Sequence, residues 1–337
     1  MSNYVKETLS DIILARINSK KYLKKSILII GAGNMAREYI VALQKMNIED
    51  ITVIGKNKKN VEILESKFNV NGYYGGVKNN IKNVEKKDLV IIATPISTLY
   101  DISKEVILSS QDNILIEKPV SFNYKEILEL EKIGKKKRIR VAFNRLVYPN
   151  IQKCSELVKN EGGIRSARFT FTEWVHTIKF LEKKEIYQKW GIANSIHVIS
   201  IVCKMIGRPK ENVSIQHGSL KWHKSGSIFV GSGISEKNIP FSYHADWESS
   251  GRWGVEVFTK ENCYRLSPLE ELEFCKKGST EWKKIHIKNQ FTGVKMGFIE
   301  EIFLMLEKKI ERTNPLPILK ETAEIIKISN QIFGYKQ

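Results

Sequence analysis

The stretch SILIIGAGNMA, residues 26–36, decides the fold that the sequence predicts. Residues 26–30 form a short apolar run, which is typical of a fully buried parallel strand. The motif G-x-G-x-x-A follows at once, over residues 31–36, and opens a helix predicted at about 34–46. A glycine-rich turn between a strand and a helix is typical of dinucleotide binding.

Each small residue of this turn has a physical role. Gly31 allows the tight turn, Gly33 lets the backbone approach a pyrophosphate, and Ala36 lets the helix pack closely on the strand. Asn34 and Met35 begin the helix, where free N–H groups and the helix dipole favour an anion. We therefore predict that Gly31, Gly33, Asn34 and Met35 bind a dinucleotide.

Strands and helices alternate through the first half of the chain. Further buried strands are predicted at 51–54, 89–93, 114–116 and 139–143, with helices at about 58–68 and 97–109 between them. Asn123 is placed to cap one more helix, with Glu126 in capping-box position. This alternation indicates a doubly wound parallel sheet, a Rossmann domain over residues 26–148.

A helical extension is expected before this domain, within residues 1–25. Apolar residues recur there at helical spacing over residues 3–24, namely Val5, Leu9, Ile12, Ile13 and Ile17.

The pattern of predicted helices and strands changes after about residue 148. A helix at 150–160 precedes β-rich segments at 167–172, 213–220, 227–230, 241–247, 254–259, 263–266 and 282–287. One long helix, at about 190–206, interrupts them, and two helices at about 295–311 and 320–333 close the chain. We predict a second, α+β domain over residues 149–337, built on a largely antiparallel sheet. The fold class is therefore α/β with two domains, as the length of 337 residues also suggests.

Composition excludes several classes of protein. Hydrophobic residues make up 42% and charged residues 27% of the chain, which is typical of a globular protein. The formal net charge is +18, but the lysines are scattered, and the one dense basic run, at 135–138, is expected in a solvated turn. We therefore expect no nucleic-acid or membrane partner. The chain shows no secretory signal or membrane span, and its four cysteines lack zinc-like spacing, so a cytoplasmic protein without a metal is expected.

The end of the second strand bears on the choice of cofactor. An acid at that point binds the ribose 2′-hydroxyl of NAD, whereas a base accommodates the 2′-phosphate of NADP. This chain has no acid there and reads Gly55-Lys56-Asn57. Lys56 therefore favours NADP(H), with NAD(H) as the alternative.

Glu117-Lys118-Pro119 follows the strand predicted at 114–116. Ligands of open α/β sheets bind at the carboxyl ends of the strands, so this tripeptide is expected beside the cofactor. A lysine that is partly desolvated there is suited to proton transfer to or from a hydroxyl.

With these motifs, the chain after residue 25 resembles the glucose–fructose oxidoreductase/inositol dehydrogenase/MocA (Gfo/Idh/MocA) family. The resemblance rests on ILIIGAGNMA, IIATP, ILIEKP, VAFNR, the helix GIANSIHVISIV and the closing helix pair. It implies a Rossmann domain followed by a domain with an open-faced sheet, which commonly forms the interface of a homodimer or homotetramer. It also implies sugars, cyclitols or nucleotide sugars as substrates.

Residue by residue, the resemblance makes Lys118 the catalytic lysine and His197 a second catalytic residue. Thr94 and Pro95 would line the nicotinamide, with Glu117, Asn144 and Arg145 nearby. The family often carries an Asp four residues before the histidine, where this chain has Ala193. Ser195 and Ser200 also depart from the family pattern, and Asn194 is the polar residue that we expect in place of the Asp.

We therefore expect an NAD(P)-dependent oxidoreductase that moves a hydride between nicotinamide and a carbinol or carbonyl carbon of a sugar-like substrate, in carbohydrate biosynthesis. Two alternatives stay open. One is a non-catalytic NAD(P)-binding regulator or scaffold, which the missing Asp favours. The other is an enzyme that uses NAD to assist elimination or hydrolysis without net oxidation. The aromatic segment 173–190 is equally consistent with substrate contact and with packing.

Overall fold

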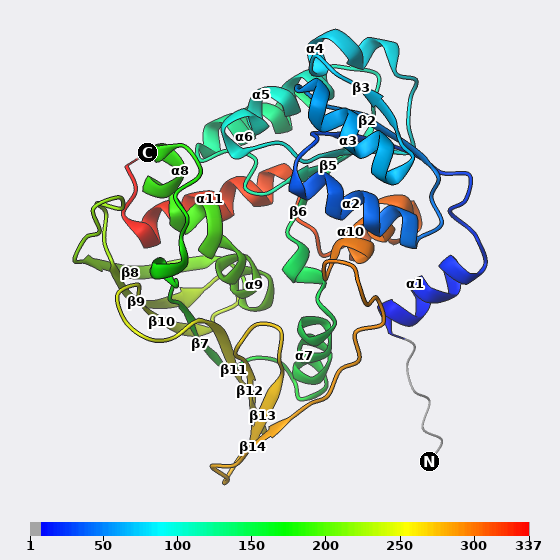
Figure 1. Cartoon of the computed structure of the whole chain (residues 1–337). Coiled ribbons are helices and arrows are strands. Elements are labelled where there is room, and N and C mark those ends of the chain that lie inside the picture. Colours follow the sequence, from blue (N-terminus) through cyan, green and yellow to red (C-terminus); the bar gives the residue numbers. More distant parts are fainter. Residues whose placement is uncertain (1–7, 337) are drawn as a thin grey trace. The chain divides into compact units, whose positions relative to one another are not determined.

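The computed structural model describes residues 8–336 and divides into two compact units (Figure 1). The first unit contains the described residues up to Ser121, then Glu126–Pro149 and Asn289–Lys320. The second contains Phe122–Lys125, Asn150–Lys288 and the described residues from Glu321 onward.

The first unit is built on a six-stranded sheet in which every pair of neighbours is parallel, in the order β3-β2-β1-β4-β5-β6. The strands are β1 (Ser26–Ile30), β2 (Asp50–Ile54), β3 (Asn71–Tyr73), β4 (Leu89–Ile92), β5 (Asn113–Glu117) and β6 (Arg138–Ala142). The predicted Rossmann sheet is confirmed. The edge strand β3 was not predicted, because its three residues, Asn-Gly-Tyr, lack an apolar run.

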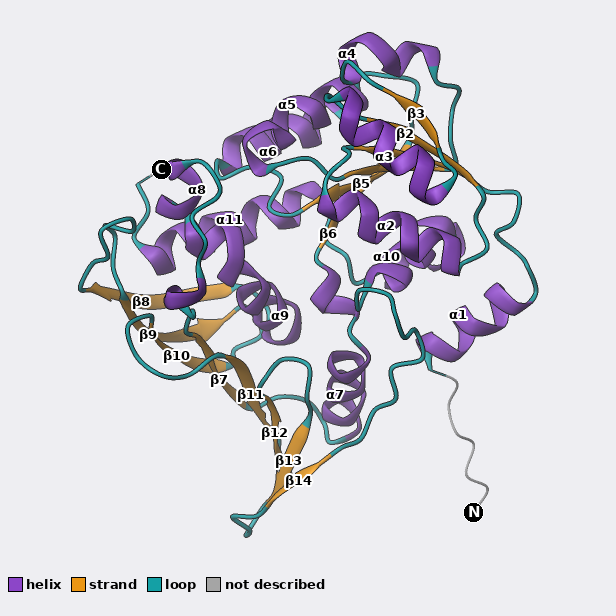
Figure 2. Cartoon of the chain, viewed as in Figure 1, coloured by secondary structure: helices purple, strands orange, loops and turns teal. Residues whose placement is uncertain are grey.

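The connecting helices explain why the central strands β4 and β5 are buried throughout. They are α2 (Asn34–Lys45), α3 (Lys58–Phe68), α4 (Val77–Asn80), α5 (Ile96–Ile107) and α6 (Tyr124–Ile133) (Figure 2). All residues of β4 and β5 are buried, because helices cover both faces of the sheet. Before α6, the Asn123 side chain accepts a hydrogen bond from the Lys125 N–H, and the Glu126 carboxyl accepts one from the Ser121 hydroxyl.

The N-terminal extension packs on the first unit. Its helix α1 spans Leu9–Asn18, which is shorter than the predicted 3–24, and Val5 lies outside the described residues. Thr8 caps the helix in a capping box with Asp11. Ile13 and Ile17 are buried in the same core cluster as α2 and α10 (Phe298–Leu306).

Helix α10 returns to the first unit, whereas the sequence placed all of 149–337 in the second domain. Its apolar side chains join the core between α1 and α2. Arg138 of β6 donates to the carbonyl oxygens of Leu304, at 2.8 Å, and Met305, and so satisfies the last turn of the helix. Arg138 is therefore a half-buried capping residue, and the basic run at 135–138 is not simply a solvated turn.

The second unit is built on an eight-stranded sheet in the order β14-β13-β12-β11-β7-β10-β9-β8. Only the β7–β10 pair among these described strands is parallel. The strands are β7 (Ser166–Phe171), β8 (Pro209–His217), β9 (Ile228–Ser235), β10 (Pro240–Asp246), β11 (Trp253–Phe258), β12 (Asn262–Leu266), β13 (Glu273–Lys276) and β14 (Trp282–Lys284). The predicted, largely antiparallel sheet is confirmed, and β13 was not predicted.

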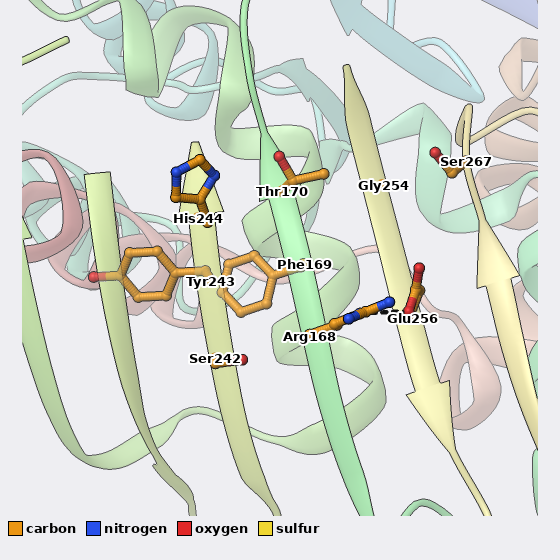
Figure 3. Close-up of a pocket in the computed structure, with 9 residues that line it drawn as sticks. All are labelled: Arg168, Phe169, Thr170, Ser242, Tyr243, His244, Gly254, Glu256 and Ser267. Carbon is orange, nitrogen blue, oxygen red and sulfur yellow. Dashed lines mark hydrogen bonds and ion pairs between the residues drawn. The ribbon is translucent and has the colours of Figure 1, made fainter. Parts of the chain in front are cut away.

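Helices cover one face of this sheet. Its helices are α7 (Pro149–Asn160), α8 (Lys184–Gln188), α9 (Ile196–Ile206) and α11 (Leu319–Phe333). Phe169 and Phe171 of β7 point toward the helical side, and Phe171 meets Phe333 of α11 edge-on. On the opposite face, Arg168 and Thr170 help to line a hollow of about 220 Å³, shown in Figure 3. The sheet is therefore open-faced.

His223 has a structural role in the second unit. It is fully buried, and its ring nitrogens hydrogen-bond the Gly226 carbonyl at 2.7 Å and the Tyr335 hydroxyl at 2.6 Å. Burial lowers the pKa of His223 to about 4. No helix within residues 8–336 has the length and apolar character needed to span a bilayer.

Candidate cofactor site and catalytic residues

The turn between β1 and α2 requires its first glycine. Gly31 has φ +121°, and a Cβ atom at this position would lie 2.3 Å from the Ala93 carbonyl oxygen. The Gly31 N–H donates to the Ile54 carbonyl at 2.8 Å and ties the turn to β2. A side chain at residue 31 would therefore push the turn away from β4.

The second glycine leaves open space at the start of α2. Gly33 is the N-cap residue, no side chain caps the helix, and a Cβ built on Gly33 meets no atom of the described chain within 4 Å. Ala36 is completely buried, as its predicted packing role requires. The first-turn N–H groups of Asn34 and Met35 thus begin an uncapped helix, which suits a pyrophosphate.

A buried hydroxyl adjoins this cradle. Thr94 follows β4, and its Oγ1 atom is buried without a hydrogen-bond partner within residues 8–336. Its methyl group lies 3.5 Å from the position of a Cβ on Gly31. Buried polar groups are usually satisfied, so an orphaned hydroxyl beside a glycine-rich turn fits a bound polar ligand. The residues present therefore fit a dinucleotide. Pro95 follows as the N-cap residue of α5.

The end of β2 presents basic and amide side chains. Lys56 is exposed, and no hydrogen bond or ion pair holds its ammonium group among the residues that the structure describes. Asn57 caps α3 by accepting from the Asn60 N–H at 3.2 Å, and Lys58 pairs with Glu62 at 3.7 Å. Lys56, directly after the end of β2, is thus exposed and available to a ligand.

The sheet order brings the glycine turn and Lys118 to one edge. The turn follows β1, Thr94 follows β4 and Lys118 follows β5, and these three parallel strands are consecutive neighbours in the sheet. Two strand spacings correspond to about 10 Å, a span that a dinucleotide can bridge. Lys118 is half-buried at this edge.

Glu117 points into the interior instead. Its carboxyl group accepts a hydrogen bond from the Tyr39 hydroxyl at 3.0 Å, and the same hydroxyl lies 3.4 Å from a carboxyl oxygen of Glu301. Burial raises the pKa of Glu117, although the nearby Lys118 and Lys295 charges oppose the shift. Burial and the Glu117 charge raise the pKa of Glu301 well above its usual value. Contact of Glu117 with a cofactor stays a prediction.

Asn144 and Arg145 lie in the short 3₁₀ turn Asn144–Val147, after β6. The Asn144 amide is buried and donates to the Met296 carbonyl at 3.1 Å, just before α10. The Arg145 guanidinium lies 5.8 Å from the centre of the Tyr148 ring. Their predicted proximity to nicotinamide stays a prediction.

In the second unit, the predicted helix 190–206 divides into two parts. Gly191–Ser195 forms a π-helical turn, and α9 follows from Ile196. A Cβ on Gly191 would lie 2.4 Å from the Phe333 ring, so this turn packs too tightly for a side chain at its start. Such π turns are frequent at functional sites. His197 is buried on the first turn of α9, 5.9 Å between ring centres from Trp253.

A carboxylate that the sequence did not single out reaches this turn. Glu173 directly follows Thr172 at the end of β7 and is 3% exposed. It accepts hydrogen bonds from Asn194 at 2.8 Å and Ser195 at 2.5 Å. Asn194 therefore faces Glu173. The signal available in the sequence was an acid just after a strand of alternating polar and apolar residues, and nothing local showed which helix it would meet.

The comparisons with known proteins agree with this architecture. Residues 25–145 match the Gfo/Idh/MocA model, described as an oxidoreductase family with an NAD-binding Rossmann fold. The match covers the Rossmann part of the chain, which is thus similar to this family of NAD-binding oxidoreductases. A search of curated proteins found no match to the chain.

Solved structures share the fold over most of the chain. A levoglucosan dehydrogenase in complex with NADH and L-sorbose is 16% identical, with a TM-score of 0.76 over 91% of this chain and 95% of its own. A UDP-N-acetylglucosamine 3-dehydrogenase from Acidithiobacillus ferrooxidans is 13% identical, with a TM-score of 0.69 over 91% and 96%. An oxidoreductase from Agrobacterium radiobacter, in complex with NAD+, L-tartaric acid and magnesium, is 11% identical, with a TM-score of 0.73 over 91% and 94%.

Proposed function

We propose that this protein is an NAD(P)-dependent oxidoreductase that acts on a carbinol or carbonyl carbon of a sugar or nucleotide sugar. The observation that carries the proposal is the shared sheet edge, where the glycine cradle, the half-buried Lys118 and a Thr94 hydroxyl with no hydrogen-bond partner in the described part of the chain follow consecutive strands. The family match of the Rossmann part supports the cofactor class. A cytoplasmic role in carbohydrate biosynthesis completes the proposal.

In this proposal the turn at Gly31 and Gly33 and the N-terminus of α2 hold the pyrophosphate, while Thr94 and Pro95 line the nicotinamide. The bound nicotinamide supplies or accepts the hydride. Lys118 gives a proton to the carbonyl oxygen during reduction, or removes the hydroxyl proton during oxidation. Its ammonium group also polarises the carbonyl.

For the second unit we propose that His197 donates a hydrogen bond to the reacting oxygen or relays the proton. Asn194 contributes a further polar contact. The burial of His197 on the turn that follows a π-helical segment supports this assignment. Asn144 and Arg145 complete the proposed surroundings of the nicotinamide.

NADP(H) is the proposed cofactor, with NAD(H) as the alternative. The proposal rests on the exposed Lys56 and on the absence of an acid directly after β2. The sugar class rests on the names of structures with the same fold, a levoglucosan dehydrogenase and a UDP-N-acetylglucosamine 3-dehydrogenase.

The open face of the second unit's sheet supports a homodimer or homotetramer. Val213, Ile215, Val230 and Ile234 alternate on β8 and β9 and are 39–65% exposed. Neighbouring exposed apolar side chains of this kind are typical of an interface. We propose a second copy of this chain as the occupant of the face.

Replacement of Lys118 by Ala tests the catalytic proposal. We expect turnover to fall by at least 100-fold, because a positioned acid–base group contributes about 10²–10⁴-fold, while NADPH affinity changes little. Activity is followed at 340 nm with a panel of aldoses, ketoses, cyclitols and UDP-sugars. Lys132→Ala, an exposed lysine on α6, is the control. Undiminished turnover in Lys118→Ala would reject the assignment.

The same assay separates the alternative functions. The alanine at position 193 favours a non-catalytic NAD(P)-binding protein, which would bind NADPH by fluorescence but convert no member of the panel. Redox-assisted elimination or hydrolysis would form product without a net absorbance change. A net change at 340 nm identifies the dehydrogenase.

A further inference from the structure

A single buried carboxylate, that of Glu173, gathers donors from two segments of the second unit, residues 194–195 and 252–253. The Glu173 Oε1 atom accepts from the Ser195 hydroxyl at 2.5 Å and from the Trp253 indole N–H at 3.2 Å. The Oε2 atom accepts from the Asn194 amide at 2.8 Å and lies 3.5 Å from the Arg252 guanidinium. Both oxygens of one side chain are therefore used.

The composition of this group fits an ionised carboxylate. The Asn194 amide nitrogen, the Trp253 indole and the Arg252 guanidinium can only donate. Burial raises the pKa of Glu173, while the Ser195 hydrogen bond and the Arg252 charge oppose the shift. A buried charge is costly unless it is paired and hydrogen-bonded, and Glu173 has both forms of compensation.

The groups held by Glu173 surround the start of the helix that carries His197. Asn194 and Ser195 end the π-helical turn directly before α9. The Trp253 ring is the one that packs beside the His197 ring, at 5.9 Å. One carboxylate thus joins the backbone that leads into His197 to a ring that flanks it.

Glu173 also fixes a cation. The Arg252 guanidinium lies 4.8 Å from the Trp174 ring centre and 4.5 Å from the Trp253 ring centre. Trp174 is in turn anchored by its indole N–H, which donates to the Gly251 carbonyl at 2.8 Å. A guanidinium between two indoles and a carboxylate has little conformational freedom left to lose when a ligand binds.

We infer that Glu173 is a positioning residue, which holds the Asn194 amide, the His197 helix start and the Arg252 guanidinium in one arrangement for the substrate. A carboxylate thereby reaches this turn from β7, although position 193 on the turn itself is alanine. The inference rests on the proposed function, because it assigns these groups to the same reaction.

Glu173→Gln is the sharpest test. Glutamine keeps the size of the side chain, but its NH₂ group must face either Trp253 and Ser195 or Asn194 and Arg252. The Trp253 indole and Arg252 guanidinium cannot accept a hydrogen bond, so neither orientation restores the network. We expect kcat to fall at least tenfold and the substrate KM to rise, with the Kd for NADPH unchanged within twofold. Glu173→Asp, which retains the charge, should recover part of kcat.

Glu161→Gln is the matched control within the same unit. Glu161 also accepts three side-chain hydrogen bonds, from Thr259, Asn262 and Tyr264 at 2.5–2.6 Å, but these donors lie at β11 and β12. The Glu161→Gln variant should keep kcat and KM within twofold of the wild-type values, even if its melting temperature falls. The substrate for all variants is the most active member of the sugar panel.

The outcomes separate the inference from the function on which it rests. An inactive wild type would overturn both. An active wild type with Glu173→Gln at full kcat, or with a loss confined to melting temperature, would overturn the positioning role alone. Should Glu173→Gln fail to fold, Ser195→Ala removes one hydrogen bond of the network. Its kcat should fall at least threefold, and an unchanged kcat would count against the inference.

Discussion

At the scale of single residues, the two glycines of the cofactor turn carry different constraints. Gly31 is required by the protein itself, since its φ of +121° and the Ala93 carbonyl leave no room for a side chain. Gly33 has a φ of −100° and open space around it, so the folded chain alone does not require glycine at residue 33.

This contrast predicts that the same substitution acts on stability at residue 31 but only on cofactor binding at residue 33. Gly31→Ala should lower the free energy of unfolding by about 1–3 kcal/mol through backbone strain, and the melting temperature with it. It should also abolish cofactor binding. Gly33→Ala should leave the melting temperature unchanged but weaken NADPH binding at least tenfold, because its methyl group would occupy the space of the pyrophosphate. Thermal melting and fluorescence titration measure the two effects. Wild-type affinity in Gly33→Ala would contradict the proposed position of the pyrophosphate.

Lys56 is predicted to set the preference between the two cofactors. Lys56→Glu should reduce kcat/KM with NADPH at least tenfold and improve it with NADH, because an acid at the end of the second strand suits a free ribose hydroxyl. Steady-state kinetics with both cofactors measure the ratio. Lys59→Glu makes the same charge change at an exposed neighbour and should move the ratio less than twofold. If both variants changed the NADPH-to-NADH ratio of kcat/KM equally, the effect would come from net charge, and the specific role of Lys56 would be rejected.

At the scale of elements, β5 and α10 of the first unit contribute three buried glutamates, Glu117, Glu300 and Glu301. Glu117 and Glu301 share the Tyr39 hydroxyl, and burial raises the pKa of Glu300 to about 7. Lys295, just before α10, opposes the shifts of Glu117 and Glu301. The folded state therefore retains protons that the unfolded chain releases above pH 4.5.

This cluster predicts that stability declines as the pH rises from about 4.5 through the raised pKa values. Glu301→Gln removes one of these carboxyls and resembles its protonated form. It should therefore match the wild type near pH 5 and exceed its unfolding free energy by about 1–2 kcal/mol at pH 8. Chemical denaturation at both pH values gives the difference. Glu62→Gln, at an exposed position on α3, should show no such trend, and a pH-independent effect of Glu301→Gln would argue against this account.

At the scale of the whole molecule, the open sheet face is the surface that we assign to self-association. Ile215→Asp places a charge among Val213, Val230 and Ile234. We expect the variant to shift toward the mass of one chain in size-exclusion chromatography with light scattering. Leu181→Asp changes a residue that is 84% exposed outside the sheet and should keep the wild-type mass. A wild type that is already monomeric, or an Ile215→Asp that stays oligomeric, would refute this interface.

Local patterns in the sequence were sufficient for much of the fold. Strands β1, β4 and β5 each contain an unbroken run of buried apolar residues, and the glycine turn has a backbone requirement visible in its residue types. Strands β3 and β13 were missed because β3 has three polar or small residues and β13 is short, with only two apolar residues between charged ones. The π-helical turn was read as plain helix, since π turns carry no periodic signal.

The sequence by itself determined the Rossmann domain, the cofactor turn and the lysine at the strand edge, because each depends on residues adjacent in the chain and on the parallel order of the strands. Only the tertiary structure decided that α10 returns to the first unit, that Glu117 meets Tyr39 and Glu301, and that Glu173 faces the turn before His197. These features depend on contacts between segments that are distant in the sequence. The hydrogen-bond partners of a buried carboxylate are set by the folded chain, because no local pattern places them.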